Sequence, residues 1–355
     1  MMKRALSSGG RKVLRWNSGI EIRLDTLWAA LLLIAAGLGF SGLAISVGAT
    51  RTGLADFISL LSGATLDEDQ LFALLDVRLP RLVLGFMAGW CVALTGAMLQ
   101  SLSQNPLADP GLLGLSQGAM VTILLLLVLA PAAPIGLVPV AAILGGLGVA
   151  VLLIWLTGGG HSDGLAILLM GIAVETVLSS VTSIMILYLP PETSFAVSDW
   201  LAGSLFQASW ATIIALAPWI ALSLPAILLL GRALSCYDLG EETAMSLGEP
   251  VPRSKPAILF TSVLLTSAAV TAVGPLAFLG VMAPHLANAL TPATGRARLV
   301  LSGLTGGILV VGADALTRGF AGDIAIPIGL ALTLLGVPLF VISMRLRAVL
   351  TLQRN

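Results

Sequence analysis

Long apolar stretches separated by short polar segments dominate the chain. A membrane-spanning helix needs about 20 mostly apolar residues. The pattern predicts ten spans, at residues 26–49, 82–102, 112–131, 135–157, 164–189, 210–231, 257–274, 275–291, 299–317 and 325–344. The eighth is the least regular, because Gly274 and Pro275 mark its border with the seventh and Pro284 lies inside it. We therefore expect an all-α polytopic membrane protein with about ten transmembrane helices.

The polar segments suggest how the chain is divided. Residues 1–25 precede the first apolar stretch, residues 26–345 form the predicted transmembrane domain, and residues 346–355 form a short tail. The apolar core of a signal peptide has roughly 7–15 residues. The first stretch is longer than that, so we interpret it as a retained helix. The longest hydrophilic segment within the transmembrane domain covers residues 232–256.

The distribution of Lys and Arg predicts the orientation of the chain, because cytoplasmic loops carry an excess of basic residues. With the N-terminus in the cytoplasm, 14 of the 18 basic residues fall in cytoplasmic segments. The four outside are Arg51, Arg78, Arg81 and Arg318. We therefore expect both termini in the cytoplasm.

Composition supports this class and excludes others. Hydrophobic residues make up 57% of the chain and charged residues 10%, and the mean hydropathy is +1.02. Ordinary soluble domains contain about 25% charged residues, so a soluble enzyme is excluded. The formal net charge is zero, which gives no argument for a nucleic-acid partner.

No motif for chemistry within the chain is present. The sequence contains no phosphate-binding G-x-x-x-x-G-K-[S/T] pattern, and its only histidines are His161 and His285. Two histidines and two distant cysteines do not form a zinc-spaced cluster. We expect no cofactor and no enzymatic activity, so the energy for any active transport must come from another subunit or from an ion gradient.

The hydrophilic segment at 232–256 contains a predicted short helix, at residues 238–248. Acidic residues at its start suit a helix N-terminus, and Gly248 suits a helix end. Its apolar positions are Leu239, Ala244, Met245 and Leu247. The segment is either a solvated connector or a docking element for a cytoplasmic partner, and the sequence pattern leaves both open.

Glu175 lies near the middle of the fifth predicted span. An ionisable group at the bilayer centre costs about 3 kcal/mol unless it faces a partner or water. It is either a pathway-lining group or a packing residue hydrogen-bonded to its neighbours. A proton-coupled secondary transporter with Glu175 as the proton carrier is the alternative function of another class.

Several motifs resemble one family closely, the FecCD-type permeases of ABC importers for iron–siderophores, haem and vitamin B12. They occur in family order over residues 75–345: Arg78-Leu79-Pro80-Arg81, Gly96 to Gln100, Asn105 to Gly114, Gly118-Ala119, Gly240-Glu241 to Gly248, Gly274 to Gly280, Pro284-His285, Ala313-Asp314 with Arg318, and Ile326 to Pro338. The chain departs from the family pattern at Asn288 and Ala325, where Arg and Glu are common.

The resemblance implies a type II ABC importer permease fold in the bacterial inner membrane. It also implies partners: a second permease subunit in a homodimer or heterodimer, cytoplasmic ATPase subunits, and a periplasmic or lipoprotein substrate-binding protein. The lipid bilayer surrounds the complex. The resemblance implies ferric siderophores as the substrate class, with vitamin B12 or haem as the alternative.

The resemblance also assigns roles to residues. Arg78, Arg81 and Arg318 match outer arginines that dock the binding protein; snorkelling to lipid headgroups is the alternative. The residues that match the ATPase-coupling loop are Asp238, Gly240, Glu241, Glu242, Ala244, Leu247 and Gly248.

Overall fold

The computed structural model describes residues 2–6, 12–16, 21–48, 50, 52–134, 136–157, 164–320 and 326–352. A helix stands at each of the ten positions where a span is predicted. These helices are α1 (Leu24–Ser46), α4 (Leu79–Ser103), α5 (Leu115–Leu129), α6 (Leu137–Leu156), α7 (Gly164–Leu187), α9 (Trp210–Tyr237), α11 (Val251–Val273), α12 (Leu279–Leu290), α13 (Gly295–Phe320) and α14 (Ile328–Leu352).

Among the described residues, seven helices are long and apolar enough to cross a membrane. They are α1, α6, α7, α9, α11, α13 and the continuous helix Glu68–Ser103, whose last part is α4. α5 and the first part of α14 are shorter apolar helices, and α12 has 12 residues. The chain is thus a multi-pass membrane protein, while a count of ten crossings stays a prediction.

Some elements were not expected from the apolar pattern. Three short antiparallel strands precede α1, namely β1 (Met2–Leu6), β2 (Lys12–Trp16) and β3 (Glu21–Arg23). The other additions are helices: α2 (Leu54–Leu61), α3 (Glu68–Leu71), the π-helical segment η1 (Phe72–Arg78) and α8 (Pro191–Leu201). α10 (Glu241–Ser246) lies within the short helix predicted at 238–248.

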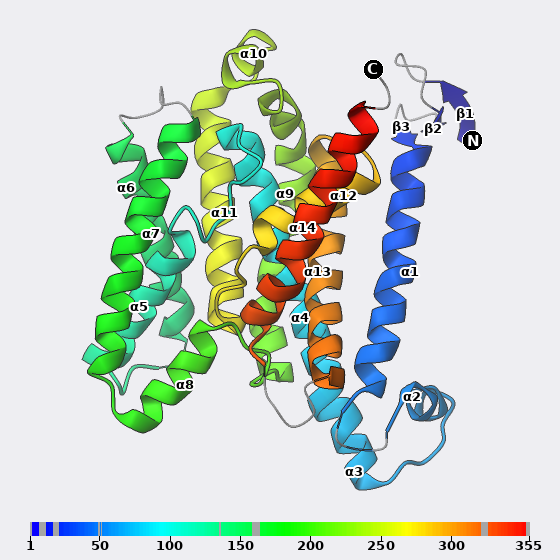
Figure 1. Cartoon of the computed structure of the whole chain (residues 1–355), viewed down its shortest axis with the longest axis vertical. Coiled ribbons are helices and arrows are strands. Elements are labelled where there is room, and N and C mark those ends of the chain that lie inside the picture. The colour runs from blue at the N-terminus through cyan, green and yellow to red at the C-terminus, as the bar shows by residue number, and fades with distance from the viewer. Residues whose placement is uncertain are drawn as a thin grey trace.

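α4 and α13 form the buried centre of the bundle. α4 packs against α13, α11 and α12, while α1 lies against α13 at the edge of the bundle (Figure 1). A Cβ built on Gly89 of α4 would lie 2.5 Å from the carbonyl oxygen of Gly306 on α13. Small residues allow such close backbone approach between membrane helices. The small-residue spacing of Gly85/Gly89 and of Gly303/Gly307 permits such an approach.

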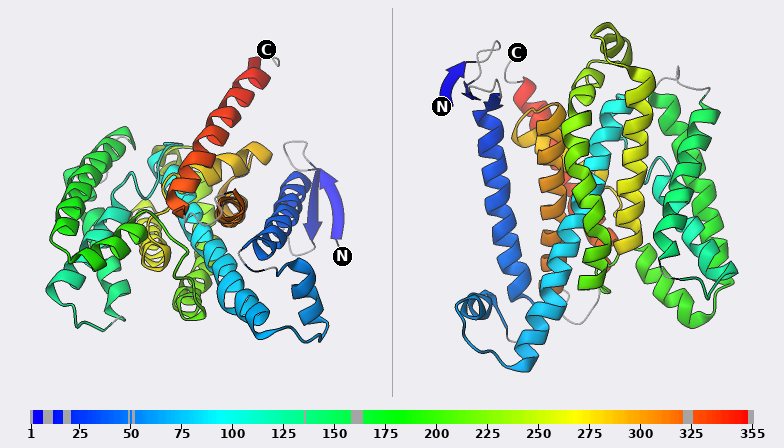
Figure 2. Two further views of the ribbon diagram at one scale, coloured as in Figure 1. Left: turned by 60° about the horizontal axis from the view of Figure 1, so that its bottom comes forward. Right: turned by 180° about the vertical axis from the view of Figure 1, so that it is seen from behind.

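Opposite ends of the bundle carry different connections. β1, α10 and the last turn of α14 lie at one end, and α2, α3 and α8 lie at the other (Figures 1 and 2). The two terminal elements and the longest hydrophilic segment therefore share one side, as the orientation prediction requires. Large apolar side chains are exposed on the outer helices, including Trp28 and Leu38 of α1 and Leu229 of α9. Such exposure suits contact with lipid or with another subunit.

Candidate functional site

A short exposed helix, α10, projects from one end of the bundle. Gly240 precedes it with a φ of 99° and Gly248 follows it with a φ of 84°, a left-handed backbone that glycine tolerates best. Of its apolar residues only Ala244 is buried, whereas Leu239, Met245 and Leu247 are 62%, 52% and 59% exposed. Glu242 is exposed as well. A helix within 238–248 is thus confirmed, at Glu241–Ser246, and Leu239, Met245 and Leu247 in and beside it are more than half exposed.

Polar bonds attach α10 to the bundle. Nζ of Lys255 on α11 lies 2.9 Å from Oε2 of Glu241. Asp238, just before α10, pairs through Oδ1 with Nη1 of Arg298 at 2.8 Å and accepts a 2.6 Å hydrogen bond from the Ser101 hydroxyl. Nη2 of Arg298 also donates to Oε1 of Gln100 at 2.9 Å. The sequence analysis did not single out Arg298 or the side chain of Gln100, because their partners lie far away in the sequence.

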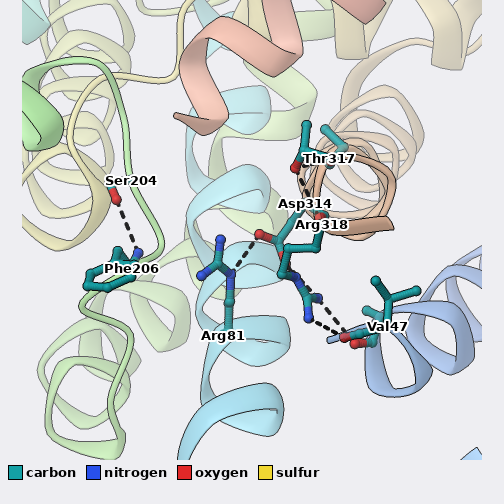
Figure 3. A network of polar contacts seen from close by, with 9 residues as sticks. Val47, Arg81, Ser204, Phe206, Asp314, Thr317 and Arg318 are labelled. Carbon is teal, nitrogen blue, oxygen red and sulfur yellow. Dashed lines mark hydrogen bonds and ion pairs between the residues drawn. The ribbon is translucent and has the colours of Figure 1, made fainter. Parts of the chain in front are cut away.

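At the opposite end of the bundle, Arg81 and Arg318 share one carboxylate. Oδ1 of Asp314 lies 2.7 Å from Nε of Arg81, and Oδ2 lies 2.8 Å from Nη2 of Arg318 (Figure 3). Asp314 is buried, whereas the side chains of Arg81 and Arg318 retain 18% and 19% exposure. Arg318 also donates to the carbonyl oxygens of Val47 and Ala44 at the end of α1. Asp314 therefore joins α4 to α13, and Arg318 joins both to α1.

Arg78 occupies a different environment from the other two arginines. Its side chain is buried, and it donates to the backbone oxygens of Ile45, Thr50 and Thr52 and to the Thr50 hydroxyl. The three-residue spacing of Arg78 and Arg81 predicts that both lie on one helical face and point out of the bilayer. Instead Arg78 turns toward the end of α1 and the segment that follows it, where backbone carbonyl groups accept hydrogen bonds from its guanidinium group. Docking by any of the three arginines remains a prediction.

Glu175 is half-buried and lines a cavity of about 330 Å³ inside the bundle. α4, α5, α7 and α11 contribute to its wall, together with residues 275–278 before α12 and 109–112 before α5. Asp109 and Gln117 are the other strongly polar lining residues. Oδ1 of Asp109 accepts from the backbone N–H of Gly111 at 2.7 Å, the hydrogen bond of an Asx turn.

A second cavity, of about 430 Å³, lies beneath α10. Its wall is apolar except for a few groups, among them Glu241 and Lys255, which pair with each other. Met245 of α10 contributes to the wall as well. The described residues include no group of three His, Cys, Asp or Glu side chains suited to a metal ion. His285 packs against Phe340, with ring centroids 4.6 Å apart.

Comparisons with known proteins match nearly the whole chain. A profile of the FecCD transport family matches residues 31–346. The Fe(3+)-citrate import system permease protein YfmE of Bacillus subtilis is 32% identical over 91% of this chain and 96% of its own length. The Fe(3+) dicitrate transport system permease protein FecC of Escherichia coli is 36% identical over 77% of this chain and 82% of its own length. The cobalamin import system permease protein BtuC of Halobacterium salinarum is 35% identical, over 77% and 73%.

A solved structure shares the fold. A putative metal-chelate type ABC transporter in an inward-facing conformation superposes with a TM-score of 0.75, at 23% identity, over 90% of this chain and 99% of that one. At this identity the likeness shows the fold alone. The family profile covers residues 31–346, and several permeases are more than 30% identical to this sequence. The chain therefore belongs to the FecCD transport family.

Proposed function

We propose that the chain is the transmembrane permease subunit of a binding-protein-dependent ABC importer that carries ferric siderophores into the cytoplasm. The family match over residues 31–346 carries this proposal. Relatives named for Fe(3+)-citrate and iron(3+)-hydroxamate import support an iron chelate as the substrate. Relatives named for cobalamin and hemin transport make vitamin B12 or haem the second candidate.

α10 is the element to which a partner ATPase would bind. The exposed Glu242 and the apolar side chains of Leu239, Met245 and Leu247, in and beside the helix, support this role, because packing within this chain leaves more than half of each apolar side chain uncovered. In this arrangement the end of the bundle with α10, β1 and the end of α14 faces the cytoplasm (Figure 1). ATP binding and hydrolysis in the ATPase would then drive alternating access of a permease dimer.

The opposite end would receive the substrate-binding protein. Arg81 and Arg318 retain exposed surface there, and one carboxylate between two guanidinium groups leaves a net positive charge. That charge suits an acidic patch on the binding protein. Arg78 belongs to the same docking prediction, although in this conformation its bonds to the segment before α2 leave little of it accessible. The four outward basic residues also include Arg51, which lies outside the described residues, as does Ala325.

The cavity beside Glu175 is the proposed section of the pathway within this subunit. Glu175, Asp109 and Gln117 give it a polar part, and the residues before α12 give it an apolar part. The substrate-binding protein would select the chelate and deliver it, so the chelate would need only weak contacts in this cavity. Substrate specificity would then rest mainly with the binding protein.

Uptake by intact cells tests this function. A strain lacking the gene for this chain is compared with the same strain carrying the wild-type gene, using ⁵⁵Fe-labelled ferric citrate, a ⁵⁵Fe-labelled hydroxamate siderophore, haemin and cobalamin. We expect loss of uptake of an iron–siderophore, restored by the gene. Loss of cobalamin or haemin uptake alone would favour the second candidate. Uptake that survives ATP depletion but collapses with an uncoupler would instead favour a proton-coupled transporter.

A further inference from the structure

A chain of polar contacts runs from the turn between α9 and α10 to the wall of the cavity beside Glu175. Its first contact is the ion pair between Asp238 and Arg298, at 2.8 Å. Its second is the hydrogen bond from Nη2 of Arg298 to Oε1 of Gln100, at 2.9 Å. Its third is the hydrogen bond from Nε2 of Gln100 to the carbonyl oxygen of Gly280, at 3.1 Å. Three contacts thus connect four elements that are distant in the sequence.

Gly280 lies in the first turn of α12, between two residues that line the cavity. Phe278 and Val281 both face the cavity of about 330 Å³, together with Pro275, Leu276 and Ala277. The backbone at Gly280 has little room to move independently of α4, since a Cβ built on Gly96 would lie 2.0 Å from its carbonyl oxygen. A displacement of Gln100 therefore has to be taken up by this turn of α12.

The contacts are sheltered, which makes them stronger than surface pairs. Gln100 and Ser101 are 5% and 2% exposed, and the side chains of Asp238 and Arg298 are 14% and 20% exposed. A guanidinium group donates through several fixed N–H groups, so Arg298 binds Asp238, Ser101 and Gln100 at once. A lysine at this position keeps the charge but has no planar fork with which to hold all three.

We propose that Arg298 is a positioning residue that transmits movement of α10 to the cavity wall through Gln100 and Gly280. This inference rests on the proposed function, in which an ATPase moves α10. The contacts from Asp238 to Gly280 are called the relay below. Contiguous networks of side chains of this kind carry coupling between distant sites when both sites bias the same element.

Two conservative substitutions interrupt the relay at different contacts. Gln100→Glu keeps an acceptor for Arg298 but replaces the N–H donor to Gly280 with an oxygen. Arg298→Lys keeps the charge beside Asp238 but loses the bond to Gln100. Arg296→Lys is the matched control, because Arg296 lies on the same helix and donates to Leu228 on α9, outside the relay.

The experiment measures movement at both ends of the relay. A fluorescent label is attached to Met245→Cys on α10 or to Phe278→Cys at the cavity, both exposed positions, in a Cys236→Ser background. The chain is purified with the ATPase that it binds and placed in lipid nanodiscs. The change in fluorescence on adding ATP and vanadate is then recorded, with the unfolding temperature as a check on folding.

We expect ATP to change the signal at both positions in the wild-type background. Gln100→Glu and Arg298→Lys should keep the response at position 245 and reduce that at position 278 by about threefold or more, while Arg296→Lys changes neither. The relay proposal would be overturned if both relay variants kept the full response at position 278. It would also be overturned if, in the wild-type background, ATP changed the signal at position 245 but not at position 278. If no ATPase co-purifies with the wild-type chain, the proposed function itself fails.

Discussion

Nε of Arg81 lies 2.7 Å from Oδ1 of Asp314, although the two residues are 233 positions apart in the sequence. The same carboxylate pairs with Arg318, whose guanidinium group also binds carbonyl oxygens at the end of α1. One buried acid therefore organises three helices and fixes the two arginines proposed to face the binding protein (Figure 3).

Asp314→Asn should destabilise the protein. The change removes the negative charge between Arg81 and Arg318 and leaves two sheltered cations facing each other. Breaking a buried pair by removing one partner costs about 3 kcal/mol or more. We expect a lower unfolding temperature in detergent, measured by thermal unfolding fluorescence. Asp76→Asn, at an exposed position near the same end, is the control and should change little. Equal unfolding temperatures for the wild type and Asp314→Asn would show that the pairing contributes nothing.

Arg78→Met should loosen the segment between α1 and α2 without unfolding the bundle. The variant leaves the carbonyl groups of Ile45, Thr50 and Thr52 without their donor. Each lost bond to a charged donor costs about 1.5–3 kcal/mol. Hydrogen–deuterium exchange should rise in peptides that cover residues 44–53 and remain unchanged in α13. Arg232→Met, at an exposed position, provides the comparison. Unchanged exchange around position 50 would argue against the anchoring role of Arg78.

Arg81→Gln should slow the docking of the substrate-binding protein. Arginines at the docking end are expected to act mainly on association, since exposed charges steer encounter. Surface plasmon resonance at two salt concentrations measures this, and the difference from the wild type should shrink as salt rises. Arg318→Gln is expected to act likewise, whereas Arg253→Gln near α10 should not. Association rates equal to the wild type for both docking-end variants would leave these arginines with a structural role only.

The combined variant Glu242→Ala with Leu247→Ala should fold normally yet lose transport. Both side chains are exposed, so their removal costs little packing in this chain. Fewer ATPase subunits should co-purify, or ATP hydrolysis should continue without uptake. Ala244→Asp is the opposite case, because Ala244 is fully buried and a charge there should reduce folded protein. Normal uptake by the double variant would contradict the role of α10.

The positions of the ten main helices could be predicted from the sequence, because a long apolar run indicates a helix whether that helix is buried in the protein or faces lipid. The short α10 was also predictable, since acids at its start and Gly248 at its end define it. The segments η1 and α8 were not, because their mixed polar and apolar residues give no clear period. They matter to the fold, since η1 ends at Arg78 and sets where its side chain points.

The side-chain networks could not be predicted from sequence order. Spacing alone placed Arg78 beside Arg81, but their partners lie in α1, in the segment between α1 and α2, and in α13, which only the folded chain brings near. Asp314 and Gln100 appeared within family motifs, whereas Arg298 appeared in none. Its role depends on Asp238 and Gln100, which lie 60 and 198 positions away.

Uptake into proteoliposomes tests the central claim most directly. The chain is purified with the ATPase that it binds and reconstituted with either ATP or ADP trapped inside. The substrate-binding protein is added outside with the ⁵⁵Fe-labelled siderophore identified in cells. The proposed function predicts that iron accumulates only in vesicles that contain ATP and that an uncoupler has no effect. Equal accumulation with ADP, or accumulation that follows a proton gradient, would contradict it.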